Sequence, residues 1–328
     1  MHRRGYWRRD CRWVAAIVVR MTTKLSIARP EDVLAAVPVL LGFQPEKSIV
    51  MLTFGGEHQV HGRIDLPPPG EVEGCLDSLI LPAVRHQVRG VLLVLYDSGP
   101  RFGAKIARRL AERLAECDID LIGCLRVEDG RWFDPLGFHD VPDDGVPFDV
   151  GAHPFRAQAV YDGQLVRRSR ADLADSIASL PVAVAETEAA LVQASSMKIY
   201  EVGRLVDDAV AGTVLSAGQI ASLLLALGDP QRRDAAWGGM AREEAKAHVR
   251  LWTDVVRRSP DDHVAHPAAV LAFAAWLSGD GALAWCALDR CFASERHHGL
   301  GLLVAQMLEG AVPPSAWEEA LTRSDAPA

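Results

Sequence analysis

The chain has 328 residues, enough for two domains, because single hydrophobic cores rarely grow beyond about 300 residues. A composition that is 49% hydrophobic and 24% charged excludes an intrinsically disordered chain. Six arginines against one aspartate give residues 1–20 a net charge of +5, which leaves −13 on the rest of a chain whose total is −8. Such an acidic body repels phosphate groups, and we expect no nucleic acid partner.

The amino-terminal stretch MHRRGYWRRDCRWVAAIVVRMTTK is basic and contains one short apolar run. That run, residues 13–19, is far shorter than the roughly 20 residues that cross a bilayer, and Arg20 follows it where a signal peptide carries small residues. We expect residues 1–20 to be a non-native or disordered extension and Met21 to be the natural start; a targeting segment is the alternative. No later stretch is typical of a membrane span, so we expect a cytoplasmic protein with no membrane partner.

The six cysteines show neither the spacing of a zinc motif nor that of a disulfide framework. Most of them stand among apolar residues, where cysteine behaves as a small buried hydrophobe. We therefore expect reduced, structural thiols.

From residue 25 onward, predicted strands alternate with predicted helices. Short apolar runs predict strands at 48–54, 60–66, 90–97, 119–127 and 131–134, and apolar residues at helical spacing predict helices over 31–41, 71–88 and 101–116. This alternation predicts an α/β domain, a mixed sheet with flanking helices, over residues 21–150.

The stretch DSGPRFGAK follows a predicted buried strand and opens a helix, a place where α/β sheets bind ligands. Its glycines and lysine suggest a phosphate loop, but three residues separate the glycines and alanine follows, so the Walker spacing is not met. A helix N-terminus beside an arginine can still hold an anion. The candidate ligand-binding residues are Asp97, Ser98, Gly99, Arg101 and Lys105, and a plain strand-to-helix turn is the alternative.

Residues 134–153, DPLGFHDVPDDGVPFDVGAH, form an acidic segment punctuated by proline. Carboxylates and imidazoles are compatible with metal binding, and the candidate ligands are Asp134, His139, Asp140 and His153. Their spacing matches no metal motif, so we interpret the segment as a solvated connection and predict no metal and no other cofactor.

Beyond residue 154 the strand signals disappear, and alanine and leucine dominate. Helices are predicted near 155–161, 171–180, 183–210, 217–227, 230–239, 242–258, 267–278, 281–294, 299–309 and 315–322. Short breaks rich in Gly, Asp and Pro separate neighbours, as they do in antiparallel helix pairs. We expect residues 151–181 to connect the first domain to an all-helical, repeat-like domain over 182–328.

Two histidine pairs stand in this half, His263 with His266 and His297 with His298. Neither pair has a further ligand at zinc spacing, so we do not expect metal there. The sequence also contains no nucleophile elbow, no His-Glu-x-x-His and no dinucleotide fingerprint, which argues against an enzyme.

The segment AFAAWLSGDGALAWCALDRC, residues 272–291, resembles one tetratricopeptide-type helical hairpin over about 265–298. It departs from that pattern at Ala268 and Ala275, where large aromatics are usual, and at Glu295, where proline often closes the unit. We interpret its aromatic and thiol side chains as packing residues: Trp276, Trp285, Cys286 and Cys291.

A wider resemblance covers residues 25–317. It rests on PEDVLAAVPVLLGFQPEKSIVML, GRIDLPPPG, EDGRWF, RRDAAWGGM, LWTDVVRRSP, AFAAWLSGDGALAWCALDRC and PPSAW, which together resemble the DUF4192 family, a domain of unknown function. The resemblance implies no activity and no catalytic residues. It supports Met21 as the start, because members begin just ahead of LSIARPEDVL, and it marks the loop after Trp132 as variable, because this chain lacks the cysteines of that region.

The leading hypothesis is a non-catalytic binding or scaffold protein whose helical domain offers a groove to a protein or peptide partner. The alternative is a small-molecule or phosphate-ligand-binding protein, or a hydrolase-type enzyme, that acts at the strand ends through Asp97, Ser98 and Arg101 with the acidic loop as a lid. A third interpretation makes the helical half a surface for self-assembly, with the oligomeric state left open.

Overall fold

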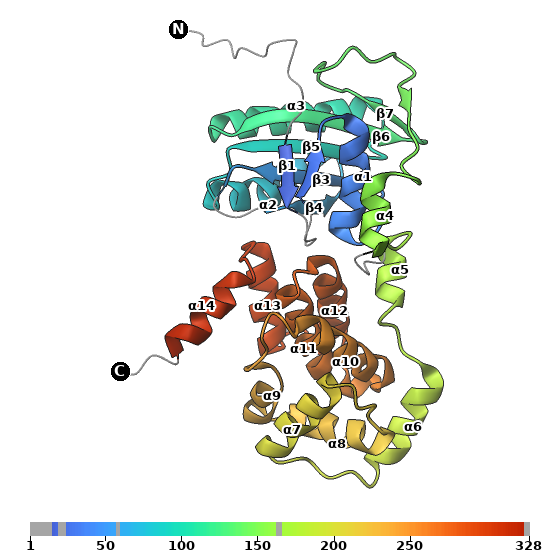
Figure 1. Cartoon of the computed structure of the whole chain (residues 1–328), viewed down its shortest axis with the longest axis vertical. Coiled ribbons are helices and arrows are strands. Elements are labelled where there is room, and N and C mark those ends of the chain that lie inside the picture. The colour runs from blue at the N-terminus through green and yellow to red at the C-terminus, as the bar shows by residue number, and fades with distance from the viewer. Residues whose placement is uncertain (1–14, 19–23, 57–59, 162–165, 325–328) are drawn as a thin grey trace. The chain divides into compact units, whose positions relative to one another are not determined.

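The computed structural model describes residues 15–18, 24–56, 60–161 and 166–324. Contacts within the chain divide it into two compact units, Met1–Ser169 and Arg170–Ala328 (Figure 1). Strands lie in the first unit, and the second is built from helices. No helix among the described residues has the length and apolar character needed to cross a bilayer.

A six-stranded mixed sheet forms the centre of the first unit, with strand order β4-β3-β5-β6-β7-β8. The strands are β3 (Ser48–Phe54), β4 (Gly62–Asp65), β5 (Gly90–Tyr96), β6 (Asp120–Glu128), β7 (Arg131–Phe133) and β8 (Val146–Pro147). Only β5 and β6 pair in parallel; the other neighbours are antiparallel. The prediction of a mixed sheet with flanking helices is confirmed.

Helices cover both faces of this sheet, which is why β5 is buried along its whole length. On one face, α2 (Val72–Arg85) and α3 (Pro100–Glu116) pack against the odd-numbered residues of β5. On the other, α1 (Pro30–Leu41) and α4 (Pro154–Tyr161) pack against its even-numbered residues, because side chains alternate along a strand. The α3 helix is the crossover between the parallel strands β5 and β6.

A separate two-stranded sheet precedes α1. Strand β1 (Ala15–Val18) pairs antiparallel with β2 (Lys24–Ile27). Sequence alone placed residues 1–20 in an extension; four of them form β1, and residues 1–14 and 19–23 lie outside the described part of the chain.

The second unit is a bundle of helices. These are α5 (Arg170–Asp175), α6 (Pro181–Leu191), α7 (Ile199–Val210), α8 (Ala217–Leu227), α9 (Pro230–Trp237), α10 (Ala245–Arg258), the short 3₁₀ turn η1 (Asp261–His263), α11 (Ala265–Leu277), α12 (Gly281–Ser294), α13 (Gly299–Glu309) and α14 (Ser315–Ser324). The α11 helix lies at the centre and contacts α8, α9, α10, α12 and α13. Every residue from Pro267 to Leu277 is buried, since its apolar side chains surround the helix on all sides.

The prediction of one helix over 183–210 is wrong, because two helices occupy this range. Residues 192–198 separate α6 from α7. The second helix starts where it does because the Glu201 carboxylate accepts the backbone N–H of Lys198 at 2.7 Å, a bond that caps a new N-terminus. The break, VQASSMK, contains neither glycine nor proline, so the sequence carried no turn signal that would have divided the helix.

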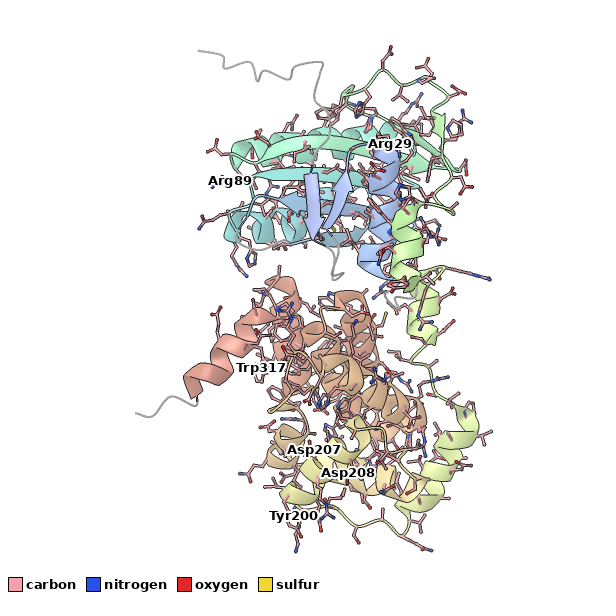
Figure 2. The ribbon with its side chains drawn as sticks, viewed as in Figure 1. Arg29, Arg89, Tyr200, Asp207, Asp208 and Trp317 are labelled. Carbon is pink, nitrogen blue, oxygen red and sulfur yellow. The ribbon has the colours of Figure 1, made fainter. Side chains whose placement is uncertain are left out.

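Aromatic side chains close the bundle around α11. Trp276 is buried, and its indole N–H donates to the carbonyl of Val312 at 3.0 Å. The rings of Trp237 and Trp317 lie 4.8 and 5.0 Å from that of Phe273. Trp317, which is labelled in Figure 2, donates its indole N–H to the carbonyl of Met240. The indole groups of Trp276 and Trp317 therefore serve as anchors between helices, with their N–H groups satisfied by backbone carbonyls.

Candidate functional site

Four of the five predicted ligand-binding residues lie where β5 leads into α3: Asp97, Ser98, Gly99 and Arg101. Asp97 accepts the backbone N–H of Lys47 at 3.0 Å, and the exposed Arg101 lies in the first turn of α3. The hydroxyl of the buried Ser98 has no hydrogen-bond partner among the described residues. Gly99 precedes α3 with a φ of 64°, in the left-handed region that glycine tolerates best.

Lys105 belongs to a different place. It lines a cavity of about 410 Å³ between α2 and α3, together with Pro69, Gly70, Val72, Glu73, Arg108, Arg109 and Glu112. The structure therefore keeps four of the five predicted ligand-binding residues in one turn and puts the fifth in another surface hollow.

Three of the four candidate metal ligands of the acidic segment share the loop after β7. The Asp134 carboxylate accepts the backbone N–H groups of Leu136, Gly137 and His139 at 3.0, 2.9 and 2.6 Å. It thereby organises the turn, while Asp140 is exposed. Within the described part of the chain, these side chains and His153 do not gather three donor atoms within 4.8 Å of one another.

His153 lies beside a buried carboxylate instead. Its Nε2 is 3.1 Å from Asp32 Oδ1, and its Nδ1 accepts the backbone N–H of Phe155 at the start of α4. Asp32 Oδ2 accepts the N–H groups of Ala28 and Arg29, both at 2.9 Å, at the start of α1. An Asp-His pair suggests general-base chemistry, but both imidazole nitrogens are already occupied. The pair holds two helix starts in place and leaves no nitrogen for a nucleophile.

The buried thiols are also poor nucleophiles. The described cysteines are all free, and three of them are buried: Cys124, Cys286 and Cys291. Burial raises the pKa of Cys286 and, aided by the charge of Glu295, raises the pKa of Cys291 to about 12. Because the thiolate is the reactive form, these side chains remain inert near neutral pH.

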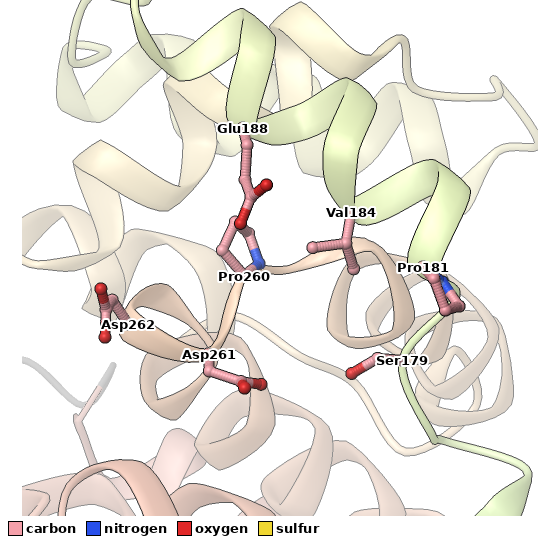
Figure 3. Close-up of a pocket in the computed structure, with 7 residues that line it drawn as sticks. All are labelled: Ser179, Pro181, Val184, Glu188, Pro260, Asp261 and Asp262. Atoms are coloured by element: carbon pink, nitrogen blue, oxygen red, sulfur yellow. The ribbon is translucent and has the colours of Figure 1, made fainter.

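The best candidate site is a cavity of about 340 Å³ in the helical unit (Figure 3). One wall is the start of α6 and the residues before it, and the other is the turn η1 that follows α10. Its lining consists of Ser179, Pro181, Val184, Glu188, Pro260, Asp261 and Asp262. We call this hollow the acidic pocket, because carboxylates are its only ionisable groups.

Hydrogen bonds hold the two walls of the acidic pocket in place. The N–H of Leu180 donates to the carbonyl of Arg257 at the end of α10, at 2.8 Å. Arg290 of α12 donates to the carbonyl of Ile177 and the hydroxyl of Ser179. The Ser294 hydroxyl donates to the carbonyl of Asp261 at 2.9 Å. The pocket is therefore formed before any ligand arrives, which reduces the entropy lost on binding.

The electrostatics of the acidic pocket favour a cation. Among the described residues, no lysine or arginine forms an ion pair with Glu188, Asp261 or Asp262. Burial lowers the pKa of the neighbouring Arg290, and Asp261 acts in the opposite direction; the guanidinium itself is engaged with neutral acceptors. The helical unit as a whole makes the electrostatic potential at the pocket more negative, since residues 170–328 contain 21 Asp and Glu against 13 Lys and Arg.

Sequence reasoning missed this pocket for a physical reason. Glu188 is separated from Asp261 by more than 70 residues, and the split of the predicted 183–210 helix changes where α6 packs. The only local signal was the Ser259-Pro260 break, which predicted a turn and said nothing of its neighbours.

The Asp32–His153 pair gives a stability prediction. Replacing Asp32 by alanine leaves two backbone N–H groups and the imidazole without their acceptor, so the free energy of unfolding should fall by about 1–3 kcal/mol. Urea denaturation at neutral pH measures this, with Asp140→Ala as the exposed control in the same unit. Equal stability of the two variants would contradict the capping role.

The carboxyl group of Asp32 also makes the free energy of unfolding depend on pH. Burial acts to raise the pKa of Asp32, but hydrogen bonds from Ala28, His153 and Arg29 together hold it below the usual value of 3.8. A lowered pKa means that the stabilisation is complete above pH 3.8 and is lost as the pH falls through the folded-state pKa. The acid limb of the stability curve should consequently be shallower in Asp32→Asn than in the natural chain.

Comparison with known proteins adds one finding. No curated protein and no solved structure matches the chain. The family model of DUF4192, described as a domain of unknown function, matches residues 30–315, which include both the sheet and the helical bundle up to the start of α14. The chain therefore belongs to the DUF4192 family.

Proposed function

We propose that this is a non-catalytic, cytoplasmic binding protein whose helical unit recognises a lysine or arginine side chain of a protein or peptide partner. The observation that carries the proposal is that the exposed Glu188, Asp261 and Asp262 line one hollow and form no ion pair among the described residues. Occupied imidazole nitrogens at His153 and inert buried thiols support a binding role over catalysis.

The lining of the acidic pocket supports a side chain with an apolar stem and a charged tip. Pro181, Val184 and Pro260 offer apolar surface beside the carboxylates. Lysine and arginine bury their methylene stems along such surface and leave the charged group among acceptors. The pocket is about the size of one such side chain with its flanking backbone, so a peptide segment is a better fit than a large rigid cofactor.

The repeat-like character of the helical unit is part of the same proposal. Helices α11 and α12 form a hairpin around the Ser278–Asp280 turn, and Ala284 is fully buried where they approach. These features support a tetratricopeptide-like, repeat-like helical domain. Such domains bind peptides along their helical surface, which is consistent with a pocket between α6 and η1.

A peptide-display selection on the intact chain tests the proposal. Enriched peptides should carry Lys or Arg, and Asp261→Asn combined with Asp262→Asn should weaken the best peptide about tenfold, or ~1.4 kcal/mol, because two acceptors lose their charge. Glu188→Lys should weaken binding of the best peptide further and remove the dependence of that binding on salt concentration.

Glu186→Lys is the matched control, since it makes the same charge change on the exposed surface of the same helix, away from the pocket. Peptides without a cation, or affinity that falls equally in the control, would contradict recognition by the acidic pocket. Binding of calcium in place of peptide, or light scattering that shows self-association through this surface, would do the same.

A second candidate function is anion binding at the start of α3. The hydroxyl of Ser98 is buried and unpartnered there, and its side chain packs so closely under the helix that a Cβ at Gly103 would collide with it. The N-terminus of α3 has no side-chain cap, and the exposed Arg101 stands beside it. Those groups suit a phosphate-bearing small molecule.

Inorganic phosphate is the probe for this second candidate. It should raise the melting temperature of the natural chain, as any ligand that prefers the folded form does, and Arg101→Ala should remove the rise. Lys105→Ala is the control, because that side chain lines the other cavity. An unchanged melting temperature in the natural chain, or an equal rise in Arg101→Ala, would rule the site out.

A further inference from the structure

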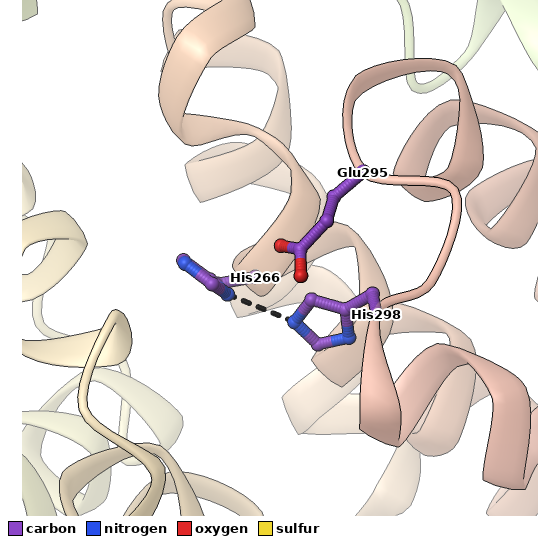
Figure 4. Close-up of side chains that lie close together, drawn as sticks. All are labelled: His266, Glu295 and His298. Carbon is purple, nitrogen blue, oxygen red and sulfur yellow. Dashed lines mark hydrogen bonds between the residues drawn. The ribbon is translucent and has the colours of Figure 1, made fainter.

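Three side chains from separate elements meet at the end of α11 that follows η1 (Figure 4). His266 is the second residue of α11, Glu295 follows the last residue of α12, and His298 precedes α13. One donor atom from each lies within 4.8 Å of the others, and His266 Nδ1 is 2.8 Å from His298 Nε2.

Sequence spacing grouped these histidines incorrectly. It paired His266 with His263 and His298 with His297 and found no third ligand for either pair. Folding instead joins one member of each pair and supplies Glu295 as the third group. The partners are brought together by the α11–α12 hairpin and the short link to α13, which no local spacing rule contains.

The donor set selects the class of ion. Two imidazole nitrogens and one carboxylate oxygen are typical ligands of divalent transition metals, whereas calcium and magnesium prefer oxygen donors throughout. His298 is buried, His266 is half-buried and Glu295 is exposed. The burial gradient leaves the carboxylate side open to solvent, where an ion can enter and keep a water ligand.

In the metal-free chain the two imidazoles are joined by a hydrogen bond. His298 Nδ1 accepts the backbone N–H of Gly301, at 3.2 Å, and so caps α13. A neutral imidazole has one N–H and one lone pair, so His298 carries its proton on Nε2 and donates it to His266 Nδ1. The Nε2 of His298 can bind a metal ion only if this proton moves to Nδ1, which ends the cap.

That loss weakens a metal site without preventing it. A helix N-cap bond is worth roughly a five-fold factor in an equilibrium constant, while a micromolar metal complex involves about six powers of ten. The charge of Arg233 in α9 acts on both imidazoles and is partly offset by Asp234, whose carboxylate lies 3.6 Å from the guanidinium. The lost cap and the charge of Arg233 both reduce the expected affinity for a metal ion. Neither outweighs the binding energy that two imidazoles and a carboxylate supply.

We infer that His266, Glu295 and His298 form a binding site for one divalent transition-metal ion, independent of the acidic pocket. Bound there, the ion replaces the hydrogen bond between the imidazoles and ties α11 to the junction of α12 and α13. The ion thus has a structural place at the end of the central helix, with one exposed face available to solvent.

The test uses the intact chain without an affinity tag, stripped of metal by a chelator and titrated with Zn²⁺ in a calorimeter. We expect one ion per chain with a dissociation constant of about micromolar, and a rise in melting temperature on binding. Co²⁺ should bind in competition with Zn²⁺ and give the visible absorption of a site with nitrogen and oxygen ligands.

Two variants separate ligation from folding. His298→Asn keeps a good N-cap for α13 and removes the nitrogen ligand, and Glu295→Gln changes an exposed group only. Each should lower the zinc affinity at least tenfold while the metal-free circular dichroism spectrum stays unchanged. His297→Gln, the exposed neighbour, should bind zinc like the natural chain.

Three results would overturn the site: no zinc uptake by the natural chain, undiminished uptake by both ligand variants, or an equal loss in His297→Gln. The last two would place any bound zinc on other side chains of the protein.

Discussion

The burial of α11 on every side is the constraint on which the helical unit depends. A helix without a polar face has no stable position at a surface, so the surrounding helices must enclose it. Its alanines allow them to approach closely, and Phe273 and Trp276 fill the gaps that remain. The hydrophobic effect therefore fixes the arrangement of the unit before any polar contact is considered.

Enclosure also decides where chemistry can occur. Side chains along the middle of α11 and on the inner face of α12 are occupied by packing, and their indole and thiol groups are satisfied or inert. Polar groups are forced to the ends of the helix, where backbone N–H and carbonyl groups need partners and the chain turns. The cluster of His266, Glu295 and His298 lies at one such end, and the nearby turn η1 forms a wall of the acidic pocket.

Burial also restricts the polar residues of the first unit, but there most of them have a structural role. Its sheet is covered on both faces, and the polar residues that remain inside hold helix starts and turns in place, as Asp32 and Asp134 do. The hydroxyls of Ser48, Tyr96 and Ser98 are buried without a hydrogen-bond partner among the described residues, and of the three only Ser98 lies in the turn that opens α3. An unsatisfied buried hydroxyl is costly, which is why the turn after β5 stays a candidate for a ligand.

Sequence reasoning was strongest where one periodic signal decides the structure. The unbroken apolar run of β5 and the amphipathic stripe of α3 lie where periodicity predicted them, because burial of the strand and of one helix face leaves a direct pattern. It was weakest where a helix ends without glycine or proline, as in the split between α6 and α7. The acidic pocket and the histidine cluster depend on contacts between residues far apart in sequence, which spacing within one segment does not encode.

One measurement tests most directly the claim that the thiol and aromatic groups of the α11–α12 hairpin serve packing. The native chain is treated with iodoacetamide, and the alkylated cysteines are mapped by mass spectrometry over time. The account predicts rapid labelling of the exposed Cys117 and protection of Cys286 and Cys291 for as long as the chain stays folded. Labelling of Cys286 and Cys291 at the rate of Cys117 would contradict it, because thiols that reactive are not part of a closed core.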